Sequence, residues 1–176
     1  MAKGVDALME WTGKASATII FDSTVDEFTD DGLFNAVRGK ANNAVVATTT
    51  TGDVFGVFYS VAVRRQDEWC SDPNVFAFSF ESHGRCATPQ RFGLKPETRE
   101  RALVYLCRGD GCGWFMRFDT PFGWLGLGNE RSDTWCWKLS CMFAGMQDTT
   151  LVTARGADPD EPTSFACTRL LVLHLL

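Results

Sequence analysis

The chain contains only two histidines, His83 and His174, and so offers few ways to activate a nucleophile. A catalytic serine or cysteine needs a neighbouring base, which is most often histidine. His174 falls inside the apolar closing segment, where a half-buried strand position is expected, and no Gly-x-Ser-x-Gly sequence is present. His83 lies in a turn-like Glu-Ser-His-Gly sequence after a strand-like run. We therefore expect no catalytic residues and treat His83 as a candidate interface residue, with a Cys/His enzyme as an alternative.

The seven cysteines suggest a second kind of chemistry, either metal binding or thiol redox. Four residues separate Cys107 from Cys112 and Cys136 from Cys141, whereas common zinc sites use C-x2-C. Cys107 and Cys112 can face each other across a hairpin, but buried free cysteines are the ordinary case. Because the count is odd and the chain is large enough to fold without disulfides, we expect reduced intracellular thiols. A thiol-based redox protein with an exposed, low-pKa cysteine remains an alternative.

An acidic segment, residues 22–31, contains the weak metal-ligand candidates Asp22, Asp26 and Asp30. An EF-hand needs acids at positions one, three and five of its loop, then a glycine at six and a glutamate at twelve. Here the acids recur every fourth residue, so the spacing does not fit. The last acids are instead expected to cap the helix that follows. We predict no metal site, and a cation-binding regulatory protein is the second alternative.

Two glycine-rich stretches, 109–113 and 123–128, have the composition of phosphate-binding loops. Such a loop links a strand to a helix N-terminus and, in a P-loop, contains Gly-Lys-Ser/Thr. Neither stretch leads into a helix-like sequence, so bulges or tight turns between strands explain them better. No cofactor is expected.

Tryptophans suggest one further contact residue. Trp69 precedes the turn-like sequence Ser-Asp-Pro and is a candidate exposed anchor for a protein partner. Trp135 and Trp137 alternate with Leu139 on one face of a predicted strand, so we expect all three in the core.

Strand-like sequences dominate the rest of the chain. The segment 54–63 is apolar on both faces, which predicts a central strand, and the phenylalanines at 76, 78 and 80 share one face. One helix is predicted over 30–38, where acids open the first turn and Gly39 follows the end. We predict a mainly β fold, a two-sheet antiparallel β-sandwich with one or two short peripheral helices. Residues 1–10 form a lead-in, and 11–176 form a single domain.

Composition limits the class of partner and the compartment. With 17 basic and 22 acidic residues, the net charge is −5, which is unlike the basic surface of a nucleic-acid-binding protein. The longest purely apolar run, 102–107, is too short to cross a membrane, and no signal-peptide pattern opens the chain. We expect no nucleic acid, no membrane insertion and a cytoplasmic location, with the nucleus as the second compartment.

Four stretches resemble the TLDc domain family of oxidation-resistance proteins: 17–24, 43–60, 72–80 and 165–174. The most specific is 43–60, an apolar strand, a glycine turn and a strand with Phe-Gly before an apolar pair. The loops 81–101 and 147–164 and the sparse glycines of 123–128 depart from the family pattern. The sequence looks more like the divergent, free-standing forms of amoeboid protists than like the animal ones.

The resemblance implies a β-sandwich without an established catalytic constellation. Some members of the family act in the oxidative-stress response, and several bind the vacuolar proton-pumping ATPase (V-ATPase) and regulate its assembly. By this analogy we expect a non-catalytic protein-interaction module whose partner is a protein, with a V-ATPase subunit as the candidate. No motif allows contact residues to be carried over from the family.

Overall fold

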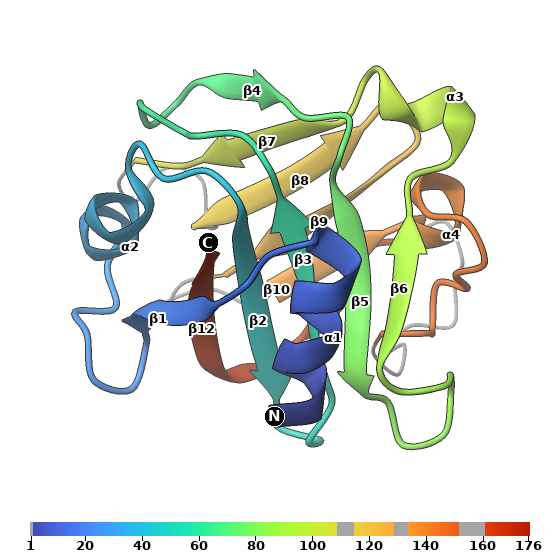
Figure 1. Ribbon diagram of the computed structural model, residues 1–176. Coiled ribbons are helices and arrows are strands. Elements are labelled where there is room, and N and C mark those ends of the chain that lie inside the picture. The colour runs from blue at the N-terminus through green and yellow to red at the C-terminus, as the bar shows by residue number, and fades with distance from the viewer. Residues whose placement is uncertain (1, 109–114, 129–133, 152–160) are drawn as a thin grey trace.

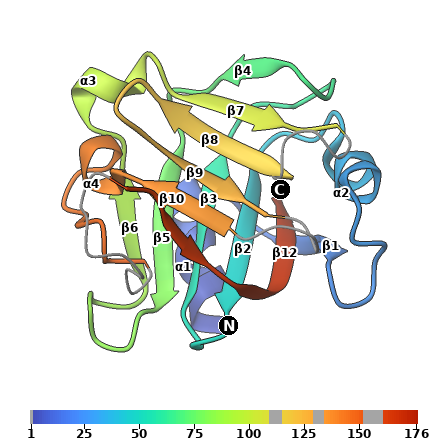
Figure 2. The ribbon, with the colours of Figure 1, turned by 180° about the vertical axis from the view of Figure 1, so that it is seen from behind.

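Strands make up most of the regular structure. The computed structural model describes residues 2–108, 115–128, 134–151 and 161–176. Across these residues, twelve strands form two six-stranded antiparallel sheets, which face each other in Figures 1 and 2. The predicted mainly β, two-sheet sandwich is therefore confirmed.

The first sheet brings the two ends of the chain together. In sheet order, its strands are β1 (Ala17–Asp22), β12 (Cys167–Leu175), β2 (Asn43–Thr49), β3 (Val54–Tyr59), β5 (Phe76–Glu81) and β6 (Gln90–Gly93). The closing strand β12 lies between β1 and β2 and pairs antiparallel with both. As predicted from its apolar faces, β3 is an internal strand, between β2 and β5.

The second sheet is a run of shorter strands, which Figure 2 shows in front of the first sheet. In sheet order, they are β11 (Thr163–Phe165), β10 (Thr134–Trp137), β9 (Gly123–Leu127), β8 (Met116–Thr120), β7 (Leu103–Leu106) and β4 (Trp69–Ser71). Strand β4 forms one edge of this sheet and carries Trp69.

Two apolar clusters hold the layers together. The larger fills the space between the sheets and includes alternate residues of β3, namely Phe55, Val57 and Tyr59. The smaller lies on the outer face of the first sheet, beneath helix α1 (Ala2–Thr12), which crosses that face in Figure 1. There Leu8 packs with a set of sheet residues that includes Phe58, Phe76 and Phe78. The expected lead-in, residues 1–10, thus contains most of a helix that covers this face.

Helix α2 (Asp30–Val37) forms where the sequence predicts a helix. The Oγ1 atom of Thr29 accepts a hydrogen bond from the backbone N–H of Gly32 at 3.1 Å, which caps the N-terminus. Leu33 and Val37 are buried on the face toward the core. The other two helices, α3 (Pro96–Arg99) and α4 (Leu139–Met142), are single turns.

The prediction that Trp135, Trp137 and Leu139 share a core face is wrong. In β10, Thr134 and Cys136 are buried, whereas both tryptophans are half-buried on the opposite face. Strand pairing ends at Trp137, and Lys138 turns the chain with a φ of 48°, so that Leu139 opens α4 and enters the core from a helix. The period-two pattern is broken by this turn.

The expectation that all cysteines are reduced thiols is also wrong, because Cys107 is disulfide-bonded. Cys107 directly follows β7, at the start of the connection to β8. Its backbone N–H donates to the carbonyl oxygen of Phe115 at 3.0 Å. Antiparallel strands thus bring the two arms of this connection together. The partner of Cys107 lies outside the described residues. Among the described cysteines, the other five are free: Cys70, Cys86, Cys136, Cys141 and Cys167.

Candidate functional site

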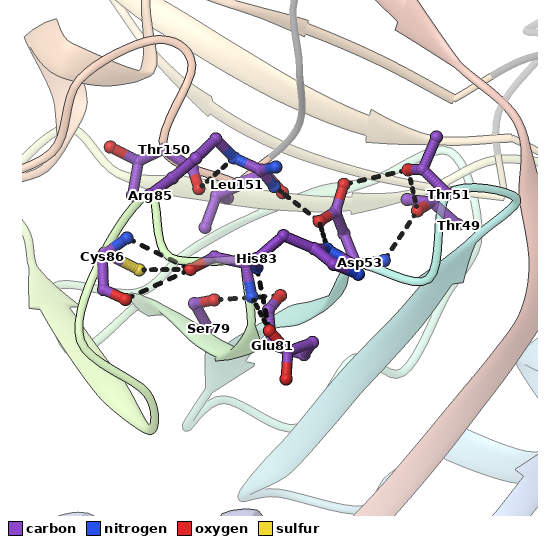
Figure 3. A network of polar contacts seen from close by, with 11 residues as sticks. Thr49, Thr51, Asp53, Ser79, Glu81, His83, Arg85, Cys86, Thr150 and Leu151 are labelled. Carbon is purple, nitrogen blue, oxygen red and sulfur yellow. Dashed lines mark hydrogen bonds and ion pairs between the residues drawn. The ribbon is translucent and has the colours of Figure 1, made fainter.

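A buried carboxylate, Asp53, is bound by one histidine and one arginine side chain at one end of the first sheet. Its side chain is only 1% exposed. His83 Nδ1 lies 2.9 Å from Asp53 Oδ1, and Arg85 Nη2 lies 2.6 Å from the same oxygen. Figure 3 shows these contacts together with those of Thr49 and Thr51. We refer to Thr49, Thr51, Asp53, His83 and Arg85 as the Asp53 cluster.

The two threonines fix Asp53 within the β2–β3 turn. The Oγ1 of Thr51 donates to Asp53 Oδ2 at 3.0 Å, and the backbone N–H of Asp53 donates to Thr49 Oγ1 at 3.0 Å. The backbone N–H of Thr49 also donates to the carbonyl oxygen of Asp53 at 2.9 Å. Gly52 has a φ of 86°, a left-handed conformation that glycine adopts without steric cost. The turn therefore holds the carboxylate in one position.

His83 is positioned by the connection between β5 and β6. Oε1 of Glu81 accepts hydrogen bonds from the backbone N–H groups of Ser82, at 2.9 Å, and His83, at 2.8 Å. The Oγ of Ser82 accepts from the backbone N–H of Cys86 at 3.1 Å and closes the loop. His83 has a φ of 51°, which is uncommon for a residue other than glycine. The Asp53 contact and the Glu81 contacts together hold this conformation.

Arg85 connects the cluster to a third segment of the chain. Its Nη2 donates to the carbonyl oxygen of Leu151 at 3.0 Å, and its Nε donates to that of Thr150 at 3.4 Å. The guanidinium therefore bridges the Asp53 carboxylate and a backbone segment that follows α4. Three connections that are distant in sequence are held together by one buried acid.

The electrostatics favour an ionised Asp53. Burial by itself raises the pKa of Asp53, but hydrogen bonds from His83, Arg85 and Thr51 outweigh it and hold the pKa below its ordinary value. Hydrogen bonds from the backbone N–H groups of His83 and Ser82 likewise lower the pKa of Glu81. The carboxylate of Asp53 is thus a fixed negative charge at neutral pH.

The Asp53–His83 pair has the geometry of two members of a catalytic triad. With Nδ1 facing Asp53, Nε2 is the ring nitrogen left for another partner, and the side chain of His83 is 54% exposed. Within the part of the chain that the structure describes, however, no serine or cysteine side chain lies within hydrogen-bonding distance of this ring. Arg85 also shares the carboxylate oxygen that His83 contacts. The arrangement suits a fixed surface contact better than nucleophile activation.

The other candidate interface residue, Trp69, lies in a different part of the molecule. Its side chain is 44% exposed, and its ring packs on Tyr105 with centroids 4.5 Å apart. The guanidinium of Arg117 lies 6.0 Å from the centroid of the Trp69 ring. In Figure 1, β4 is at the top of the view and the end of β5 is at the bottom. The structure therefore does not bring Trp69 and His83 together.

The acidic segment is occupied by contacts within the chain. Asp22 forms an ion pair with Arg169, whose Nε donates to Asp22 Oδ1 at 3.0 Å. This hydrogen bond holds the pKa of Asp22 well below its usual range. Asp26 Oδ2 accepts from the backbone N–H of Asp22 at 2.7 Å, and Asp30 lies in the first turn of α2. No group of three or more His, Cys, Asp or Glu side chains is arranged for a metal among the described residues.

Three of the free thiols, those of Cys70, Cys136 and Cys167, are poor candidates for redox chemistry. Burial raises the pKa of Cys136 to about 12, and burial also raises the pKa of Cys70 and Cys167. A reactive cysteine requires the opposite shift, because the thiolate is the nucleophile. These three cysteines behave as small core or boundary residues.

Sequence reasoning identified His83 but missed Asp53 and Arg85. Asp53 lies in the β2–β3 connection and His83 in the β5–β6 connection. These connections are neighbours only because β3 pairs with β5, with Val54 opposite Glu81. The available signal was a histidine and an arginine two residues apart in a turn, together with a carboxylate after Thr-Thr-Gly. These residues can be recognised as one cluster only when the register of β3 against β5 is known.

Comparison of the sequence with protein-family models and with curated proteins finds no match. Among the described residues, no helix is long and apolar enough to cross a membrane. The resemblance to TLDc domains therefore stays a prediction.

Proposed function

We propose that the chain is a non-catalytic, TLDc-type protein-interaction module that acts in the oxidative-stress response or in regulation of the vacuolar proton-pumping ATPase. The sequence resemblance supports the family and the class of partner. The two-sheet sandwich is consistent with that resemblance. A cytoplasmic or nuclear location belongs to the same proposal.

The observation that carries the proposal is the Asp53 cluster. Protein interfaces gain affinity when the contact surface is already ordered before binding. Here a buried acid connects three loops, while the side chain of His83 remains 54% exposed at their surface. We assign the loop surface around His83 as the partner-binding surface.

The alternatives have less support from the same residues. A thiol-based redox protein needs a cysteine of low pKa, and burial raises the pKa of Cys70, Cys136 and Cys167. A cation-binding protein needs free carboxylates, and Asp22 is paired with Arg169. A Cys/His enzyme needs a nucleophile beside His83, and the described residues supply none within reach.

The test is binding of the purified chain to vesicles that contain the purified proton pump. Co-sedimentation is compared with vesicles of the same lipids without the pump, and proton transport is followed in parallel. We expect pump-dependent binding of the wild type. His83→Asn should weaken this binding, because asparagine tolerates the left-handed backbone but removes the imidazole.

Trp69→Ala is the matched variant on the second sheet. Loss of binding in Trp69→Ala with normal binding of His83→Asn would move the partner surface to the second sheet. If the wild type does not bind pump-containing vesicles, the pump is not its partner. Turnover of an ester, peptide or peroxide substrate by the purified chain would contradict the non-catalytic assignment.

A further inference from the structure

A second site lies at the opposite end of the first sheet. A pocket of about 260 Å³ opens between the C-terminal end of α1 and the outer face of β3, β5 and β6. Its lining combines three aromatic residues with one cation and several neutral polar groups. We propose that this pocket binds a small organic carboxylate, with the carboxylate group against Arg91 and an apolar group against Trp11. The inference is independent of the proposed function, because the pocket contains no residue of the Asp53 cluster.

The apolar wall is an ordered aromatic cluster. Phe58 and Phe76 stack with ring centroids 4.9 Å apart. The ring of Trp11 meets Phe76 edge-on at 6.2 Å. Phe58 and Phe76 are 5% and 2% exposed, so they form a fixed floor, while Trp11 is half-buried at the rim. The half-buried ring of Trp11 is the part of this wall that an apolar group of a ligand can contact.

Arg91 supplies the charge. Its guanidinium lies 4.3 Å from the centroid of the Phe76 ring. A guanidinium held against an aromatic face keeps its N–H edges available for a carboxylate, which it binds with two parallel hydrogen bonds. No acidic residue lines the pocket, and among the described residues no carboxylate forms an ion pair with Arg91. In a chain of net charge −5, an unpaired arginine beside a pocket favours an anionic ligand.

The polar wall is built on a second buried acid, Asp72, which is 0% exposed. The Oγ of Ser60 donates to Asp72 Oδ1 at 2.8 Å, and the backbone N–H of Asn74 donates to the same oxygen at 3.0 Å. The Nδ2 of Asn74 then donates to Ser60 Oγ at 3.1 Å. Asn42 completes this wall, with its backbone N–H donating to the carbonyl oxygen of Ser60 at 3.3 Å. A ligand amide or hydroxyl can hydrogen-bond here without rearrangement of the loop.

The dimensions indicate a small ligand. Pockets for drug-sized molecules occupy about 300–1,000 Å³, so a pocket of about 260 Å³ accommodates a group the size of one acylated amino acid. A free acyl amino acid and the C-terminal residue of a peptide present the same chemistry: a carboxylate, an apolar side chain and an amide. The experiment separates these two sources.

The test is an NMR titration with N-acetyl-L-leucine, using N-acetyl-L-leucinamide as the uncharged probe of the same shape. We expect the acid to shift the indole signal of Trp11 and the side-chain amide signals of Asn42 and Asn74, with a Kd of about 1 mM. The amide should bind at least about tenfold more weakly, because it lacks the charge that Arg91 recognises.

Two variants test the role of the guanidinium. Arg91→Gln should weaken binding of the acid about tenfold or more and should retain the wild-type spectrum elsewhere, because the side chain is exposed. Arg64→Gln makes the same charge change at an exposed position outside the pocket and should bind like the wild type. A pentapeptide that ends in leucine, with a free or an amidated C-terminus, is titrated in parallel.

Each outcome decides the proposal. Tighter binding of the free peptide terminus than of N-acetyl-L-leucine assigns the source as a protein C-terminus, and the reverse order assigns it as a small molecule. Both orders support the carboxylate site. Equal binding of acid and amide, normal binding by Arg91→Gln, or no saturable shift at about 20 mM acid would overturn it.

Discussion

The β2–β3 hairpin has a buried aspartate near each end, and the two are held in different ways. Asp53 follows the turn at one end and binds the side chains of His83 and Arg85. Asp72 lies beside the other end and accepts hydrogen bonds from Ser60, Val61 and Asn74, all of them uncharged donors. Both aspartates are at most 1% exposed.

The difference shows how one type of buried residue can serve two purposes. A carboxylate that accepts hydrogen bonds from uncharged donors fixes a loop and places no charged side chain at the surface around it. A carboxylate bound by partly exposed basic side chains connects several loops and reaches the surface through those side chains. In this molecule the first kind supports a ligand pocket, and the second kind supports a proposed protein contact.

The largest effect is expected at the middle of the hairpin, because both ends depend on it. A Cβ atom at Gly56 would lie 2.1 Å from the carbonyl oxygen of Val45 and 2.4 Å from the ring of Phe78. Since the backbone cannot move aside, we expect Gly56→Ala to lower the free energy of unfolding by more than about 3 kcal/mol. Urea unfolding followed by circular dichroism measures this. Gly93→Ala in β6 is the control, because a Cβ there meets nothing within 4 Å; equal unfolding midpoints for the two variants would contradict the packing argument.

The next effect is expected at Asp72. Asp72→Ala removes the acceptor for three backbone N–H groups, those of Ser60, Val61 and Asn74. Because buried donors without partners are costly, we expect a loss of about 2–3 kcal/mol in the free energy of unfolding. Asp6→Ala, the same change at an exposed position of α1, should cost less than about 0.5 kcal/mol. A loss at Asp72 as small as the one at Asp6 would show that the N–H groups find other partners.

A smaller, pH-dependent effect is expected at Asp53. Asp53→Asn should cost about 1–2 kcal/mol at pH 7, because the partners His83 and Arg85 are partly exposed and can be solvated. The pKa of Asp53 is lowered in the folded chain, so the stabilisation is fully present above the ordinary pKa of about 4. It is lost as the pH falls through the lowered pKa of the folded state. The difference in the free energy of unfolding between wild type and Asp53→Asn should therefore begin to shrink below about pH 4 and disappear below the lowered pKa of the folded state. A difference that stays constant as the pH falls would contradict the ion-pair account.

The smallest effect on stability is expected at His83. His83→Asn removes a half-exposed partner of Asp53 and should cost less than about 1 kcal/mol. His83→Ala should cost roughly 0.5–1 kcal/mol more than His83→Asn, because alanine is less tolerant of a φ of 51°. Thermal unfolding of both variants provides the comparison. If His83→Asn is as destabilising as Asp53→Asn, the imidazole rather than Arg85 is the principal partner of Asp53.

Local patterns predicted much of the fold correctly. The alternation of the phenylalanines at 76, 78 and 80 marks the outer face of β5, where all three contribute to the cluster beneath α1. The apolar sequence of β3 indicated a strand with neighbours on both sides. Acids at the first turn and a glycine after the last turn located α2. Each of these signals lies within one element.

The parts that sequence reasoning missed arise between elements. The Asp53 cluster requires the register of β3 against β5, and a period of two residues does not specify the partner strand. The carboxylate pocket requires α1 to pack on the first sheet so that Trp11 lies near Arg91. The entry of Leu139 into the core, although Trp135 and Trp137 face outward, follows from one positive φ at Lys138, a position without glycine. Neither the pairing of distant strands nor a turn made by one residue can be predicted well from a single sequence.

The most direct test of the difference between the Asp53 end and the Asp72 end is a binding measurement with vesicles that contain the proton pump. The wild type, His83→Asn and Arg91→Gln are measured side by side. If the Asp53 end carries the protein contact and the Asp72 end carries the pocket, His83→Asn should weaken pump binding about tenfold, whereas Arg91→Gln should bind like the wild type. Normal binding by His83→Asn, or an equal loss in Arg91→Gln, would contradict this division of the hairpin into two functional ends.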